Sequence, residues 1–213
     1  MMEIKSFVCN PYRENTYILY DDTGAAAIID PGMYGQQEEK IFDDFICAEE
    51  LTPELLLNTH CHIDHVLGNR YVYDHFGLLP QFHEGELPQL MEVQNYAPQM
   101  GLRYDTSPIA ETFLPAAGTV TFGRQELTVI SAPGHSPAHL CFYCEAGGFL
   151  IGGDVLFRNS IGRTDLPGGN HQQLLDSITR MLYVLPEETV VYPGHGPETT
   201  ISYEKKNNPF IRG

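Results

Sequence analysis

Thr-His-Cys-His-Ile-Asp-His, residues 59–65, places three imidazoles and one carboxylate within six residues. A run of three leucines comes shortly before it, and an apolar run that changes abruptly to polar residues is typical of a buried strand ending in a loop. Alternate residues of an extended segment point the same way, so His60 and His62 can reach one metal ion together. The chain must then turn, which lets Asp64 and His65 face a second position. The stretch therefore predicts metal binding.

Length and composition indicate a water-soluble globular protein. The chain has 213 residues, enough for one domain with a full core, and 42% of them are hydrophobic and 19% charged. No run of about 18 or more apolar residues occurs, so we expect no membrane span. The first residues show no secretory signal, and an odd count of five cysteines fits a reducing compartment. We therefore expect a cytoplasmic protein.

The formal net charge is −16, from 28 acidic and 12 basic residues. This field repels a nucleic-acid backbone, and no basic patch is visible, so we expect no nucleic-acid partner. Two divalent cations held with two carboxylates would still leave a local charge of about +2 in a cleft. A small anionic substrate is therefore permitted.

The rest of the chain predicts a mixed α/β fold. Strands are expected at residues 3–9, 15–21, 24–30, 55–58, 119–122, 126–131, 139–144, 148–152 and 189–192. Helices are expected at 36–50, 66–76, 86–100 and 171–185, the last capped by Asn170. Residues 78–117 contain five prolines and, apart from the helix at 86–100, are expected to be irregular and to form a connection or a lid.

Three later residues repeat the context of the first stretch. His135, Asp154 and His195 each follow an apolar, strand-like run through a turn that contains glycine. Glycine lets the backbone pack tightly, and strand ends meet at one edge of a sheet. These three residues are therefore expected to share a site with the first stretch.

The whole pattern, His60-x-His62-x-Asp64-His65 followed by the three later residues in that order, resembles the metallo-β-lactamase superfamily. The resemblance covers nearly the whole chain. It implies a single domain over residues 1–213, an αββα sandwich, and a two-metal site at the edge where the sheets meet. By the same resemblance, one ion is held by His60, His62 and His135, the other by Asp64, His65 and His195, and Asp154 bridges them.

Within that superfamily the chain resembles the glyoxalase II-like hydrolases. The resemblance also includes Pro133–Ser136, Gly153–Phe157, Ile161–Asp165 and Pro193–Gly196. That family hydrolyses S-acylglutathione thioesters, notably S-lactoylglutathione. Its full-length members carry a C-terminal helical domain that contacts glutathione, whereas about 18 residues follow His195 here. The chain resembles the short form of the family.

The ligand types fit metal-assisted hydrolysis of a thioester. Imidazole and carboxylate suit two divalent metal ions, for which we expect zinc, with iron and manganese as alternatives. Two cations about 3.5–4 Å apart can share a hydroxide whose parent water has its pKa lowered to roughly 7. This bridging hydroxide would attack the carbonyl, with Asp64 as ligand and orienting group. Arg163, nine residues after Asp154, is the candidate contact for an anionic substrate.

Two other functions stay open. A persulfide dioxygenase resembles this pattern but uses one iron, through the positions of His60, His135 and Asp154, and consumes oxygen. A non-catalytic metal-binding partner module is the third hypothesis. Metal content and oxygen uptake distinguish them from a hydrolase.

Several chemically active residues are expected to be structural. Cys141 and Cys144 are three apart in a strand pattern, so their side chains should point to opposite faces and not act as a pair. Cys61 should point away from the metals, and His139 should support the site or the fold. Surface or capping positions are expected for His75, His83 and His171.

Overall fold

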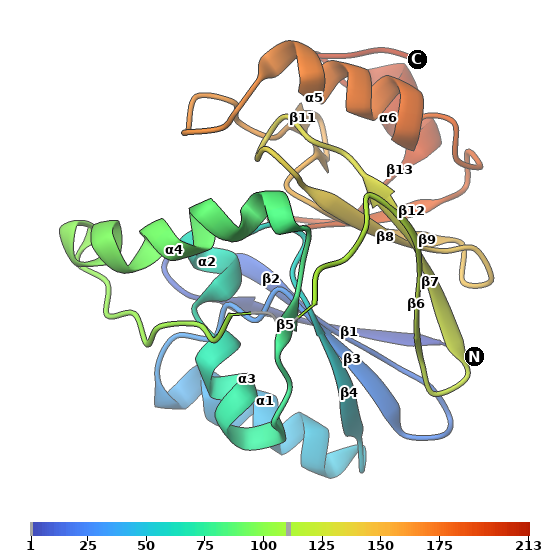
Figure 1. The fold of residues 1–213 in the computed structure, drawn as a ribbon. Coiled ribbons are helices and arrows are strands. Elements are labelled where there is room, and N and C mark those ends of the chain that lie inside the picture. The colour runs from blue at the N-terminus through green and yellow to red at the C-terminus, as the bar shows by residue number, and fades with distance from the viewer. Residues whose placement is uncertain (1, 110–111) are drawn as a thin grey trace. The chain divides into compact units, whose positions relative to one another are not determined.

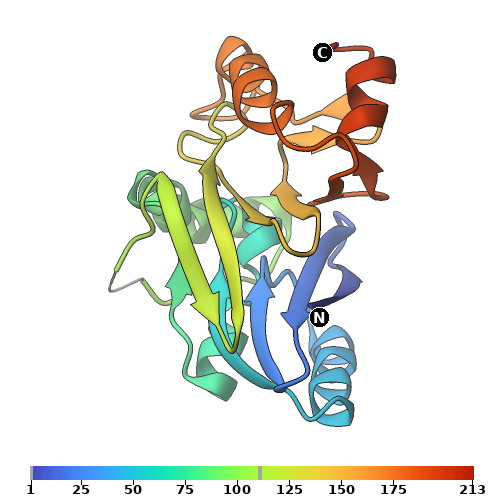
Figure 2. The same cartoon turned by 90° about the vertical axis from the view of Figure 1, so that its right-hand side faces the viewer.

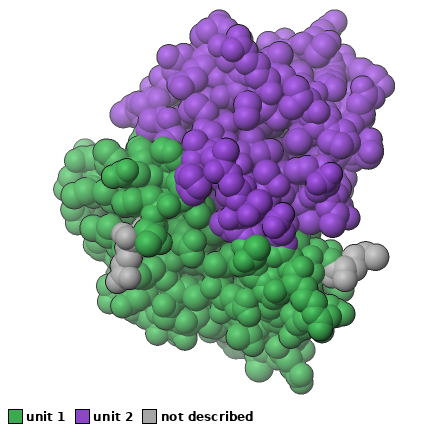
Figure 3. Space-filling view, turned by 45° about the vertical axis from the view of Figure 1, so that its right-hand side comes forward, with its two compact units in different colours: residues 1–114, 121–125 green, residues 115–120, 126–213 purple. Residues whose placement is uncertain are grey.

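The computed structural model describes residues 2–109 and 112–213, and the chain divides into two compact units (Figures 1 and 3). Unit 1 comprises residues 1–114 and 121–125, and unit 2 comprises residues 115–120 and 126–213. Each unit contains strands and helices, so the predicted mixed α/β class is confirmed. The organisation as a single domain stays a prediction.

Unit 1 contains a five-stranded sheet in the order β1-β2-β3-β4-β5. Its strands are β1 (Glu3–Cys9), β2 (Glu14–Tyr20), β3 (Ala25–Ile29), β4 (Thr52–Leu57) and β5 (Pro80–Gln81). The first three strands pair antiparallel, whereas β3, β4 and β5 run parallel. The carboxyl ends of β3 and β4 therefore lie at the same edge of the sheet, and the loops that begin there carry Asp30 and the histidine stretch.

The helices of unit 1 form two apolar clusters with the sheet. They are α1 (Gln36–Ala48), α2 (Ile63–Val66), α3 (Asn69–Phe76) and α4 (Leu87–Tyr96), with short 3₁₀ helices η1 (Glu84–Glu86) and η2 (Ala97–Met100). Helices α1 and α3 cover one face of the sheet, where Phe42 and Val72 pack with Ile28 (Figure 1). Helices α2 and α4 enclose the second cluster, around Phe82 and Leu90.

Unit 2 contains a sheet in the order β13-β12-β9-β8-β7-β6, with the hairpin tip at 121–125 counted in unit 1. Its strands are β6 (Ala117–Phe122), β7 (Gln125–Ser131), β8 (Leu140–Cys144), β9 (Phe149–Gly153), β12 (Val190–Pro193) and β13 (Thr199–Thr200). β7 and β9 are both antiparallel to β8, and β12 is parallel to β9. Three strands therefore end at one edge, and His135, Asp154 and His195 follow those three ends.

Three further helical segments pack on the sheet of unit 2. Helix α5 (His171–Ser177) continues into a π-helical turn, η3 (Ile178–Leu182), and α6 is Ile201–Asn207. Figure 2 shows both helices packed against the strands of unit 2. Leu174 of α5 and Ile201 of α6 belong to one buried cluster with strand residues such as Leu150. The Asn170 side chain accepts a hydrogen bond from the Gln173 N–H, so the predicted cap is confirmed.

The structure differs from the predicted elements in several places. The helix expected at 66–76 begins at Asn69 as α3, and Val66 instead ends the separate short helix α2. Between the two, the Gly68 N–H donates to the Pro31 carbonyl, 2.7 Å away, which interrupts the helical pattern. A small hairpin, β10 (Leu156–Phe157) with β11 (Ser160–Ile161), was not expected. The helix expected at 86–100 is confirmed as α4 followed by η2, within the connection predicted at 78–117, whose residues 110 and 111 lie outside the described residues. No helix of the described chain is long and apolar enough to cross a membrane.

Candidate metal centre

The structure brings the four predicted ligands of unit 1 together. His60 and His65 are fully buried, and His62 and Asp64 are half-buried. The His60 ring centroid lies 4.7 Å from that of His62 and 4.2 Å from that of His65. His62 is extended, with φ −69° and ψ 152°, and α2 begins at the next residue. This change of conformation is the predicted turn, and it leaves Asp64 Oδ2 3.7 Å from His65 Nε2.

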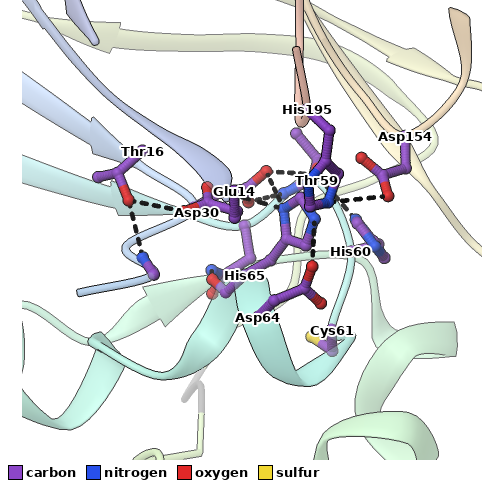
Figure 4. A network of polar contacts seen from close by, with 12 residues as sticks. Glu14, Thr16, Asp30, Thr59, His60, Cys61, Asp64, His65, Asp154 and His195 are labelled. Carbon is purple, nitrogen blue, oxygen red and sulfur yellow. Dashed lines mark hydrogen bonds and ion pairs between the residues drawn. The ribbon is translucent and has the colours of Figure 1, made fainter. Parts of the chain in front are cut away.

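Asp30, at the end of β3, orients two of these histidines (Figure 4). Its Oδ2 accepts hydrogen bonds from His65 Nδ1 at 3.0 Å and from Thr59 Oγ1 at 2.6 Å, and its Oδ1 accepts from the Thr59 N–H at 2.7 Å. A hydroxyl has one hydrogen, so Thr59 Oγ1 must accept at its 3.0 Å contact with His60 Nδ1. Both imidazoles therefore carry their proton on Nδ1 and present Nε2 as the metal-binding nitrogen.

Asp30 itself is a geometric alternative as a ligand. One oxygen of Asp30 and one nitrogen each of His60 and His65 lie within 4.8 Å of one another. However, the carboxylate contacts the Nδ1 side of His65, opposite to the nitrogen that the tautomer leaves for a metal, and both oxygens already accept hydrogen bonds. We therefore assign Asp30 as a supporting residue. Sequence reasoning missed it, although its place after a strand parallel to β4 is the signal that could have found it.

Glu14, at the start of β2, is a second buried carboxylate that sequence reasoning missed. It is fully buried, and its Oε2 accepts from Thr16 Oγ1 at 2.9 Å. Its Oε1 lies 4.0 Å from His65 Nδ1 and has no hydrogen-bond partner among the described residues. Burial raises the pKa of the Glu14 carboxyl well above its usual range, and the nearby His65 opposes this rise. A glutamate at the head of an apolar strand was the available signal.

The backbone of the ligand loop is also held by side chains. Asn10 Nδ2 donates to the carbonyl of Asp64 at 2.9 Å, and Asn58 Nδ2 donates to that of His65 at 3.0 Å. The buried Glu86 carboxylate accepts from the Cys61 N–H at 3.1 Å. The Cys61 side chain belongs to the α2–α4 cluster and points away from the imidazoles, as predicted (Figure 4). Of the side chains that hold the ligands and the ligand loop, only Thr59 belongs to the stretch 59–65.

In unit 2 two of the predicted ligands, both histidines, converge on one carboxylate oxygen of the third, Asp154. Asp154 Oδ2 lies 3.5 Å from His135 Nε2 and 3.6 Å from His195 Nε2. His135 Nδ1 donates to the Arg163 carbonyl at 2.8 Å, so its Nε2 is the nitrogen that faces Asp154. The predicted tight turn is present as well, since a Cβ at Gly134 (φ 133°) would lie 2.3 Å from the backbone nitrogen of Leu174.

His139 has the supporting role that the sequence predicted. The ring is fully buried, and its Nε2 accepts a hydrogen bond from the Asp154 N–H at 3.1 Å. Because Nε2 is an acceptor, the neutral ring carries its proton on Nδ1. His139 therefore fixes the backbone of the residue on which the other two ligands converge.

The remaining residues named in the sequence analysis are an arginine, two cysteines and three histidines. The Arg163 guanidinium is 61% exposed and pairs with Asp165 through two contacts of 2.8 Å, so its contact with substrate stays a prediction. Cys141 and Cys144 are both buried, and neither is joined in a disulfide to a described residue. The surface or capping positions expected for three histidines are confirmed: His75 and His171 are exposed, and His83 caps η1.

The sequence matches the metallo-β-lactamase superfamily over residues 9–195. The chain therefore belongs to the metallo-β-lactamase superfamily, and the fold that the sequence resemblance implied is confirmed.

Three similar proteins give this membership more detail. The hydroxyacylglutathione hydrolase GloC of Haemophilus influenzae is 32% identical over 217 residues, covering 99% of this chain and 98% of that protein. The crystal structure of the BLEG-1 B3 metallo-β-lactamase is 37% identical, with a TM-score of 0.91 and coverage of 99% of this chain and 100% of that one. The crystal structure of TTHA1623 in a di-iron-bound form is 35% identical, with a TM-score of 0.86 and coverage of 97% and 100%.

Proposed function

We propose that the protein is a metal-dependent thioester hydrolase that acts on S-lactoylglutathione and related thioesters through two metal ions. The observation that carries this proposal is the position of Asp154 Oδ2, 3.5 Å and 3.6 Å from the Nε2 atoms of two histidines. A carboxylate that bridges two ions needs such a position, because each histidine then binds a different ion. The similarity to GloC, which is named a hydroxyacylglutathione hydrolase, supports the choice of substrate.

The proposed ligands follow the superfamily resemblance. One ion is held by His60, His62 and His135, the second by Asp64, His65 and His195, and Asp154 contacts both. The tautomers support this assignment, because the Nδ1 atoms of His60, His65 and His135 all carry protons that are held by other groups. Imidazole nitrogen and carboxylate oxygen suit zinc, iron and manganese alike. The di-iron form of TTHA1623 puts iron beside zinc as a candidate.

The chain's own residues would position the reacting groups. When bound, two divalent ions supply Lewis acidity and a hydroxide at neutral pH. Asp64 is half-buried, so its carboxylate can both bind an ion and orient the attacking oxygen, while Asn10 fixes its backbone. A thiolate is a fair leaving group, so the reaction needs no strong general acid.

Hydrolysis of β-lactams is the second candidate function. It is favoured by the 37% identity to BLEG-1, a protein named as a B3 metallo-β-lactamase. A thioester and a β-lactam are both attacked at a carbonyl carbon, so the same ligands suit both reactions. The two candidates differ in what holds the rest of the substrate.

The test combines metal analysis with four assays. The protein is purified with zinc or iron supplied, and the metal content per chain is measured. Four substrates are then assayed: S-lactoylglutathione, an uncharged thioester, a cephalosporin and glutathione persulfide. Oxygen uptake with the persulfide is followed with an oxygen electrode. We expect about two metal ions per chain and thioester hydrolysis, with a high KM for S-lactoylglutathione. Stable saturation at one ion with full activity would contradict the dinuclear site. A fully metallated protein that hydrolyses no thioester would contradict the thioesterase, and oxygen uptake would then favour the dioxygenase.

A further inference from the structure

The turn between β1 and β2, residues Asn10–Arg13, has an unusual backbone. It is closed by a hydrogen bond from the Arg13 N–H to the Asn10 carbonyl, at 3.1 Å. Asn10 has φ 52° and Arg13 has φ 59°, which is the left-handed region that side-chain-bearing residues seldom adopt. Such conformations persist where the surrounding structure fixes them, and they cluster at binding sites.

Both ends of this turn are fixed to the ligand loop. At one end, Asn10 Nδ2 donates to the Asp64 carbonyl at 2.9 Å and to the Gly32 carbonyl at 3.0 Å. At the other end, Glu14 places its carboxylate 4.0 Å from His65 Nδ1. The three segments meet at Gly32, where a Cβ would lie 2.1 Å from Glu14 Oε2 and 2.6 Å from the Asp64 carbonyl oxygen. The turn is therefore built onto two of the proposed metal ligands.

The middle of the turn presents exposed side chains beside those ligands. Pro11, Tyr12 and Arg13 are all exposed, Tyr12 by 39%. Partial burial, and secondarily the negative charge of Asp64, raise the pKa of the Tyr12 phenol. The turn that is fixed to the ligand loop therefore carries an exposed aromatic ring and an exposed guanidinium.

Arg13 differs from Arg163, the substrate contact predicted from the sequence, in having no acidic partner among the described residues. Arg70, Arg103 and Arg163 each pair with an aspartate two or four residues later, at 2.8–3.0 Å. Arg13 makes no such ion pair with any residue that the structure describes. In a chain with 28 acidic and 12 basic residues, an exposed guanidinium without an ion pair, on a turn fixed to the ligand loop, is available to a carboxylate from outside.

We propose that the Asn10–Arg13 turn binds the thiol part of the substrate. Arg13 pairs with a carboxylate of the leaving thiol through its planar fork of N–H donors, and the Tyr12 ring covers the adjacent aliphatic part. The proposal rests on the proposed function and narrows it to thioesters whose thiol carries a carboxylate. It gives Arg13 the role that sequence reasoning predicted for Arg163, whose guanidinium already pairs with Asp165.

The kinetic test compares a charged and an uncharged thiol. Arg13→Asn is the main variant, because asparagine tolerates the left-handed conformation, and Tyr12→Ala is the second. Each is assayed with S-lactoylglutathione and with the lactoyl thioester of N-acetylcysteamine. For Arg13→Asn we expect KM for S-lactoylglutathione to rise about tenfold with kcat within a factor of two, and no change with the uncharged thioester. Arg70→Asn, an exposed arginine of the same unit, is the matched control and should change neither.

Binding without turnover gives an independent measurement. S-methylglutathione cannot be hydrolysed, so its dissociation constant is measured by calorimetry on the metal-loaded proteins. We expect Arg13→Asn to bind S-methylglutathione about tenfold more weakly than the wild type, with unchanged metal content. At high salt the dissociation constants of the two proteins should become equal, because salt screens the ion pair.

The outcomes distinguish a failure of the proposed role of the turn from a failure of the proposed thioesterase function. Equal losses on both thioesters, or a selective loss in Arg163→Asn but not in Arg13→Asn, would overturn the role of the turn while the thioesterase stands. If the wild type hydrolyses neither thioester but Arg13→Asn still weakens S-methylglutathione binding, the thioesterase fails and the anion-binding turn is supported.

Discussion

The two halves of the candidate centre are held by different kinds of group. In unit 1, four ligands lie within six residues, and buried side chains orient them, chiefly Asp30, Thr59 and Asn10. In unit 2, three ligands are spread over three strand ends. The groups that orient them are a backbone carbonyl and the buried ring of His139.

This difference determines where each half is sensitive to substitution. A side chain that orients a ligand can be removed by one mutation, whereas a carbonyl such as that of Arg163 remains whatever residue stands there. Asp30 also serves two histidines that are proposed to bind different ions. Unit 1 should therefore lose metal through residues that never touch it, and unit 2 mainly through its ligands.

The largest effect is expected from Asp154→Ala. Removal of a bridging carboxylate leaves two close cations uncompensated, so metal content should fall from about two ions to at most one, and turnover by more than about 100-fold. Asp165→Ala is the matched control and should bind both ions. Equal metal occupancy in the two variants would remove Asp154 from the centre.

Asp30→Asn tests whether side-chain support in unit 1 matters for metal. An amide can no longer accept from both Thr59 and His65 with the strength of a carboxylate, so metal affinity should fall about 10–100-fold. Asp21→Asn is a good control, because Asp21 is also buried and hydrogen-bonded but contacts no histidine. The two variants are compared by competition with a chelator and by thermal unfolding. If both lose affinity equally, Asp30 acts through stability alone.

His139→Ala tests the corresponding support in unit 2. It leaves the Asp154 N–H without its acceptor, which should cost about 1–3 kcal/mol of stability and roughly tenfold in metal affinity. His139→Gln offers a side-chain carbonyl and should recover part of the affinity, while the exposed His75→Ala should change nothing. Cobalt substitution adds a spectroscopic readout, since a displaced Asp154 would alter the visible bands. Unaltered bands in His139→Ala would show that the ring only fills space.

The smallest effect is expected from Thr59→Val. Valine removes the oxygen that accepts from His60 Nδ1 but leaves the bond between Asp30 and His65, so one ion should bind about fivefold more weakly, for a hydrogen bond of about 1 kcal/mol. Thr59→Ser keeps the hydroxyl and should behave as wild type. Metal titration of the two variants provides the comparison. A loss at both ions would mean that Thr59 supports the loop as a whole.

The sequence by itself determined which residues are ligand candidates and which elements carry them. Hydrophobic periodicity and turn residues depend on neighbours in the chain, so most strands, the Asn170 cap and the strand–turn–ligand pattern could be predicted. The structure brings the seven predicted ligands together as a group of four in unit 1 and a group of three in unit 2. Their union in one dinuclear centre stays a prediction.

Only the tertiary structure decided how those ligands are supported. Asp30 and Glu14 precede the ligand loop by tens of residues, and no local pattern joins them to His65. They reach it because β3 pairs parallel with β4 and antiparallel with β2, a choice that depends on the burial of whole strands. The tautomers of His60 and His65 follow from hydrogen bonds that lead to Asp30, and a further non-local hydrogen bond anchors the Asn10–Arg13 turn to Asp64.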